Sequence, residues 1–141
     1  MTKPELKVQL HPGWREVKIP NAPTTYVRGA TSDSGALQIS LAQFRAGKLP
    51  NASEQLLVAI CEKMASNVQG VKEKSSRSGI CDFGMFGTVV VRGNSPSYFQ
   101  VWVLSNVREF ILVTHTCAKE PDPVEIVEAN EIALKIGCTW A

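Results

Sequence analysis

Residues 99–104 have the sequence FQVWVL, with an apolar side chain at every position except Gln100. Because successive side chains of a strand point to opposite faces, Val101 and Val103 share one face and Trp102 lies on the other. A strand that is apolar on both faces needs packed elements on both sides. The stretch therefore predicts a central strand within a sheet that is covered on each face.

The next run, residues 110–116, follows after a short turn at residues 105–108. Two such runs joined by a short polar turn predict an antiparallel hairpin. His115 continues the face formed by Ile111 and Val113, which favours a hydrogen-bonded histidine in the core or at an edge of the sheet.

Further strands are predicted on the N-terminal side of this hairpin. Alternation of apolar and polar residues predicts half-buried strands at residues 6–10 and 37–41. Residues 72–116 are predicted to form strands and turns throughout. Within them, Gly84 and Gly87 interrupt an apolar run in a manner typical of a bulge or a tight turn.

A first helix is predicted between Pro50 and Gly70, where the apolar period changes from two to about 3.6 residues. Asn51 or Ser53 is placed to cap its N-terminus, and Gly70 stands just beyond its end. Its apolar face consists of Leu56, Leu57, Ile60, Cys61, Met64, Ala65 and Val68.

A second helix is predicted to begin at Asp122 and Pro123, an N-cap followed by proline at the first helical position. Glu125 is expected to interact with the positive end of this helix. Gly137 is expected to end the helix, which leaves residues 138–141 as a short tail.

These elements predict an α+β fold, with an antiparallel sheet of about six or seven strands flanked by two main helices. The chain has 141 residues, which suits one domain, and we expect a single α+β domain over residues 1–141. Apolar residues make up 44% of the chain and charged residues 20%, a balance typical of a globular protein.

The formal net charge of +2 argues against nucleic acid or an anionic membrane as the partner. The one basic concentration, Lys72, Lys74 and Arg77, is interleaved with Glu73, which indicates a solvated loop or strand edge. The N-terminus lacks a signal-peptide pattern, and no apolar run approaches the ~18 residues of a membrane span. A cytoplasmic location is therefore predicted.

Cys81, Asp82 and His115 are the residue types of a thiol nucleophile with its base and its orienting acid. Since Cys81 stands inside an apolar strand, a buried structural cysteine is the favoured interpretation, and no catalytic residue is assigned. No metal site is predicted, because no C-x-x-C pair occurs and only His11 and His115 are available. No cofactor is predicted, because the sequence contains neither a GxGxxG nor a GxxxxGK(S/T) pattern. The chain has four cysteines, Cys61, Cys81, Cys117 and Cys138.

The order of features resembles the Mog1/PsbP-like superfamily. The resemblance rests on an early strand before Pro12-Gly13-Trp14, the polar turn into residues 36–40, a helix, a meander containing residues 101–104, and a closing helix. It implies an antiparallel sheet flanked by helices and a role in binding another protein, since members act as nuclear-transport cofactors, photosystem subunits or secretion chaperones. It carries no active site across, and it suggests a small bacterial-type cytosolic member.

The favoured function is a non-enzymatic protein-binding module, such as an adaptor, a chaperone or an immunity-type protein, with a protein partner. The alternative is a small-molecule-binding domain or an enzyme, with a pocket between the sheet and the first helix near Phe83, Phe86 and His115. A third possibility is a homodimer formed through an exposed strand edge.

Overall fold

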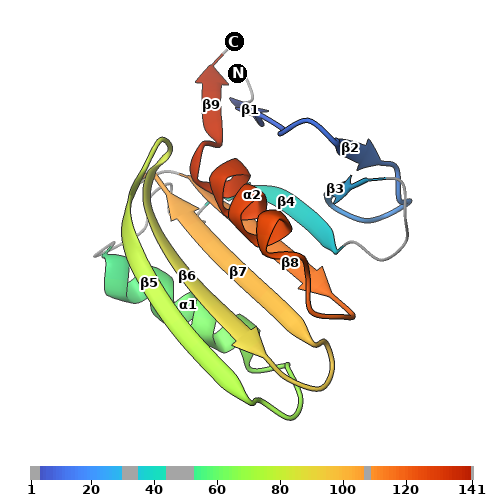
Figure 1. The fold of residues 1–141 in the computed structure, drawn as a ribbon. Helices are drawn as coiled ribbons and strands as arrows, with labels where there is room; N and C mark the ends of the chain where they lie inside the picture. Colours follow the sequence, from blue (N-terminus) through green and yellow to red (C-terminus); the bar gives the residue numbers. More distant parts are fainter. Residues whose placement is uncertain (1–3, 30–34, 44–52, 107–108, 141) are drawn as a thin grey trace.

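The computed structural model describes residues 4–29, 35–43, 53–106 and 109–140, and these form an α+β fold (Figure 1). In chain order the elements are β1 (Pro4–Lys7), β2 (Trp14–Val17), β3 (Thr24–Arg28), β4 (Ala36–Gln43), α1 (Glu54–Ala65), β5 (Glu73–Cys81), β6 (Gly84–Arg92), β7 (Tyr98–Ser105), β8 (Glu109–Cys117), α2 (Pro123–Leu134) and β9 (Gly137–Trp140). No helix in these ranges is both long enough and apolar enough to cross a membrane.

The main sheet has seven strands in the order β2-β3-β4-β8-β7-β6-β5, and every neighbouring pair is antiparallel. The predicted hairpin is the pair β7 and β8. Strand β7 lies between β8 and β6, with α1 on one side of the sheet and α2 on the other (Figure 1). The prediction of a covered central strand at residues 99–104 is therefore confirmed.

Each helix closes a separate apolar core. Trp102 and Leu104 pack in the core on the α2 side, whereas Val101 and Val103 pack in the core on the α1 side, as their alternation predicts. Both helices begin with the expected caps: the Oγ of Ser53 accepts the N–H of Leu56 at 3.1 Å, and Asp122 caps α2.

Gly84 and Gly87 have different roles. Gly84 adopts a φ of +155° at the tight β5–β6 turn, which is the predicted role. Gly87 lies in a regular ladder opposite Ser78, so the bulge predicted there is wrong. A Cβ on Gly87 would lie 2.6 Å from the backbone nitrogen of Val58, so glycine lets α1 approach the sheet closely.

Two strands depart from the expected pattern. Residues 137–140 were expected to be a helix end and a tail, but they form β9, which pairs with β1. The first strand spans Pro4–Lys7 rather than residues 6–10, because its register is set by this partner from the far end of the chain. Strand β2, Trp14–Val17, follows directly on the predicted turn.

Candidate functional site: a groove beside the second helix

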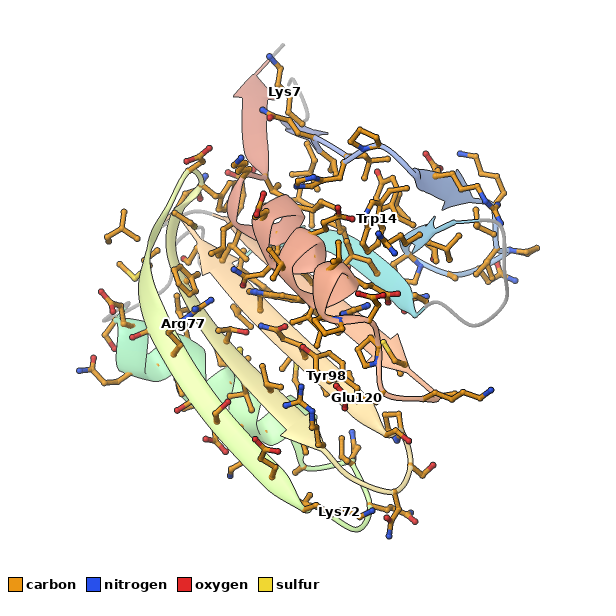
Figure 2. All side chains as sticks on the ribbon, viewed as in Figure 1. Lys7, Trp14, Lys72, Arg77, Tyr98 and Glu120 are labelled. Carbon is orange, nitrogen blue, oxygen red and sulfur yellow. The ribbon has the colours of Figure 1, made fainter. Side chains whose placement is uncertain are left out.

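Helix α2 leaves part of its face of the sheet open, and a groove of about 400 Å³ lies between α2 and strands β5, β6 and β7. Figure 2 shows Arg77 on β5, with Tyr98 and Glu120 nearer the Lys72 end of that strand. The groove is lined by Ser75, Arg77, Val90, Arg92, Tyr98, Gln100, Ile126, Val127, Asn130 and Glu131.

Strand β5 sends alternate side chains to the two faces of the sheet. On the α1 side, Lys74 Nζ lies 2.6 Å from Glu62 Oε2, and Ser78 Oγ donates a hydrogen bond to Glu54 at 2.8 Å. Arg77 directly precedes Ser78 in the strand, so its side chain points to the opposite face, where it lines the groove. The predicted strand edge at the basic concentration is therefore confirmed for Lys74 and Arg77, which lie exposed on the terminal strand.

Arg92 is held firmly at one end of the groove. Its Nε and Nη2 donate to the two carboxylate oxygens of Glu120 at 2.9 and 3.1 Å, a bidentate pair, and Glu73 lies 3.9 Å away. The guanidinium lies over the Tyr98 ring, 5.1 Å from its centroid. The charge of Arg92 is therefore oriented and already neutralised.

Arg77 is oriented by an amide instead of an acid. Its Nη2 donates to Asn130 Oδ1 at 3.1 Å, and the same oxygen accepts the indole N–H of the buried Trp102, also at 3.1 Å. Two donors on that oxygen fix the orientation of the Asn130 amide, whose NH₂ group then faces away from the indole. Within the described residues no carboxylate lies at ion-pair distance from Arg77.

The floor of the groove is a chain of buried neutral hydrogen bonds. Tyr98 Oη donates to Gln100 Oε1 at 3.0 Å, Gln100 Nε2 donates to Thr88 Oγ1 at 3.0 Å, and Thr88 Oγ1 donates to the carbonyl oxygen of Val101 at 2.8 Å. Burial raises the pKa of Tyr98 well above its ordinary value, so the phenol stays neutral. The floor is preorganised and presents no charge of its own.

A second cluster, His115, Cys117 and Glu125, lies wholly inside the protein next to this floor. The Oε2 of Glu125 is 2.7 Å from His115 Nε2, 3.0 Å from the N–H of Gly35, and 3.7 Å from the Sγ of Cys117. Burial alone would raise the pKa of Glu125, but hydrogen bonds from His115 and Gly35 lower it overall. The cluster therefore holds an ionised carboxylate surrounded by donors.

This cluster is not arranged as a catalytic relay. Cys117 Sγ lies 3.4 Å from His115 Nε2, the same nitrogen that meets Glu125, so the thiol and the acid compete for one side of the imidazole. The other nitrogen, Nδ1, has no hydrogen-bond partner among the described residues. Burial and the neighbouring Glu125 raise the pKa of Cys117 to about 12, so its thiol is not activated.

Among the described residues, the same three side chains form a group that could hold a metal ion, since their ligand atoms lie within 4.8 Å of one another. Tetrahedral zinc would need the nitrogen and oxygen ligands about 3.4 Å apart, wider than the 2.7 Å between His115 and Glu125. The backbone of Gly35 also closes the cluster, because a Cβ there would overlap the Sγ of Cys117. The distance between His115 Nε2 and Glu125 Oε2 therefore fits a direct hydrogen bond better than two ligands of one zinc ion.

The cluster sets the position of the groove wall. Glu125 belongs to the first turn of α2, and its bonds to His115 and Gly35 fix that turn against β8 and the start of β4. The Tyr98 ring meets the His115 ring edge-on, with 5.6 Å between centroids. The cluster therefore links the wall of the groove to its floor.

The residues expected to line a pocket lie elsewhere. Phe83 and Phe86 are core residues, 7% and 5% exposed, and His115 is fully buried. All three lie on the α2 side of the sheet, so the pocket expected between the sheet and the first helix is placed on the wrong face. Strand alternation groups residues by face but does not tell which helix covers that face.

The triad considered from the sequence does not assemble. His115 meets Cys117 and Glu125, whereas Cys81 lies at the β5–β6 turn opposite Gly84 and is only half-buried. The position of Cys117 beside His115 could have been predicted from the sequence, since a residue two positions further along a strand lies on the same face. The burial of Glu125 could not have been predicted, because a charged residue in the first turn of a helix is ordinarily solvated.

No family model and no curated protein matches the chain. Among solved structures it is similar to the solution structure of cyanobacterial PsbP (CyanoP) from Synechocystis sp. PCC 6803, with a TM-score of 0.62 and 11% sequence identity. The alignment covers 96% of this chain and 91% of CyanoP. The chain has a Mog1/PsbP-like fold. At 11% identity, the similarity to CyanoP establishes the fold and does not establish a function.

Proposed function

We propose that the chain is a non-enzymatic protein-binding module that accepts an extended segment of a partner protein along β5 and in the groove beside α2. The observation that carries this proposal is the juxtaposition of a long terminal strand with a groove on one of its faces. Main-chain groups on the outer side of such a strand provide affinity for an added strand, and an adjoining groove provides specificity for its side chains.

Strand β5 is well suited to receive a segment. It runs for nine residues with an unbroken register against β6, whereas the opposite terminal strand, β2, has four. Ser75, Ser76 and Gly79 are small, so another backbone can approach closely. Lys74 and Arg77 disfavour pairing between two copies of the strand, because like charges would be brought together.

The groove adds a recognition surface along one face of that strand. Alternate side chains of an added segment would project toward α2, where Val127 is 56% exposed and Ile126 lines the wall. An exposed valine next to a polar, preformed floor supports binding of a mixed apolar and polar segment.

The non-enzymatic part of the proposal rests on the chemistry of the groups that line the groove. Guanidinium, amide and neutral phenol groups orient a ligand and are neither nucleophiles nor bases near neutral pH, and the carboxylate that lines the groove, Glu131, accepts a hydrogen bond from His11. A cytoplasmic location belongs to the same proposal, since free thiols at Cys61, Cys81 and Cys117 suit a reducing compartment.

The test is selection of random 12-residue peptides displayed on phage against the wild-type chain and against Val127→Trp, which fills the groove. Val124→Trp is the matched control, because Val124 is similarly exposed on α2 but does not line the groove. We expect peptides that bind the wild type and the control but not Val127→Trp, and that slow amide exchange in β5. Peptides that bind all three chains equally, or enrichment of none, would overturn the proposal.

Two competing occupants are distinguished by further measurements. A groove of about 400 Å³ with two arginines also suits an anionic small molecule, and native mass spectrometry of the purified chain would reveal a retained metabolite. A second copy of the chain on β5 would appear as a concentration-dependent dimer in sedimentation, abolished by Val127→Trp. Either result would replace the peptide segment as the occupant.

A further inference from the structure

The charges around the groove are unevenly matched. Glu120 is paired with Arg92, and Glu131, the acid in the groove wall, accepts a hydrogen bond from His11 Nε2 at 2.9 Å. Lys74, on the opposite face of β5, is paired with Glu62. Among the described residues, no carboxylate lies at ion-pair distance from Arg77, the other basic residue of the groove.

The guanidinium of Arg77 is also oriented before any ligand binds. Its bond to Asn130 uses one of its five donors, and the indole N–H of the fully buried Trp102 holds the acceptor oxygen in place. Since both side chains are already ordered, a ligand that binds here loses little additional side-chain entropy. The remaining donors of Arg77 and the NH₂ group of Asn130 suit a carboxylate.

The neighbours of Arg77 leave space for such a ligand. Ser75 and Gly79, two positions away on either side, share its face of β5 and are small. In an added strand, the side chain directly opposite Arg77 on this face would have its Cβ about 5 Å from that of Arg77. An Asp or Glu at that one position would reach the guanidinium.

We propose that the segment bound along β5 is acidic, and that Arg77 selects it by pairing with an Asp or Glu aligned with it across the added strand. This inference rests on the proposed function and adds the chemistry of the partner. Arg92 acts differently, since Glu120 already satisfies its charge and Tyr98 supports its position.

The test repeats the phage selection on Arg77→Gln, Arg77→Glu and Lys74→Gln and compares the composition of the recovered peptides. Lys74→Gln is the matched control, because it removes the same charge from the same strand on the opposite face. We expect Asp and Glu to be enriched on the wild type and on Lys74→Gln, lost on Arg77→Gln, and replaced by Lys and Arg on Arg77→Glu. Circular dichroism establishes that each variant is folded.

Affinity measured by fluorescence anisotropy gives a second criterion. A recovered acidic peptide should bind Arg77→Gln roughly tenfold or more weakly than the wild type, and replacing its acidic residue by Gln should cost the wild type a similar factor. Recovered peptides without acidic enrichment would overturn the inference and leave the proposed function intact. Tighter binding of a ten-nucleotide oligothymidine than of any recovered peptide would overturn it in favour of nucleic acid.

Discussion

Glu125 on α2 and His115 on β8 are joined across 2.7 Å inside the core, with less than 5% of either residue exposed to solvent. A buried carboxylate is tolerated only with donors around it, and here His115, Gly35 and Cys117 surround a single oxygen. This arrangement fixes the first turn of α2, and therefore the wall of the groove, relative to the sheet.

Glu125→Ala is expected to lower the free energy of unfolding by about 3–5 kcal/mol, because it leaves the buried His115 side chain without its partner. Glu62→Ala removes a carboxylate from a solvent-exposed ion pair on α1 and is expected to cost less than about 1 kcal/mol. Urea denaturation of both variants measures the difference. Equal losses would mean that the buried cluster does not anchor α2.

The stability of the wild type is expected to fall as the pH drops below about 4.5, the ordinary pKa of a glutamate side chain. The pKa of Glu125 is lowered in the folded state, so its contribution is complete above the unfolded pKa and is lost as the pH falls through the folded pKa. Urea midpoints at pH 7, 5 and 3.5 give the slope. Glu125→Gln should flatten this slope, whereas a slope equal to that of the wild type would exclude Glu125 as its source.

Glu128 contributes a second, smaller part of the same acid dependence. Hydrogen bonds from Trp14 and Arg28 lower its pKa, but its carboxylate is close to solvent. Glu128→Gln should therefore change the slope less than Glu125→Gln does, because solvent screens its interactions.

Thiol reactivity is expected to follow burial, with Cys81 modified by iodoacetamide at pH 8 well before Cys61 and Cys117. Burial raises the pKa of both Cys61 and Cys117 to about 12; it also raises the pKa of Cys81, but Cys81 is only half-buried, at a turn, and is therefore the more accessible thiol. Peptide mass spectrometry after timed labelling gives the order. Early labelling of Cys117 in the folded chain would contradict the closed cluster described here.

Local sequence patterns predicted the elements that depend on local chemistry. The alternation in residues 99–104 predicted a covered strand because both of its faces are apolar, and Asp122-Pro123 predicted the start of α2 from capping alone. The pairing of β1 with β9 was missed, since it joins the two ends of the chain and depends on tertiary structure.

The candidate site was less predictable for the same physical reason. Arg77 was recognised as basic and exposed, but the groove beside it arises from where α2 crosses the sheet. Glu125 lies in the first turn of α2, as expected, but the sequence did not indicate that it would be buried against His115. Side-chain partners that come from different elements cannot be read from the spacing within either element.

Gly35→Ala should destabilise the chain by about 1–3 kcal/mol, the usual cost of adding a methyl group to a filled interior. The added Cβ would overlap the Sγ of Cys117, and it would lie 2.8 Å from the carbonyl oxygen of Thr116 and 3.0 Å from His115 Nε2. Gly137→Ala is the matched control, because within the described residues no heavy atom beyond its two chain neighbours lies within 4 Å of its Cβ position. If thermal denaturation gives the two variants the same midpoint, Gly35 does not close the cluster, and α2 is anchored by Glu125 and His115 without it.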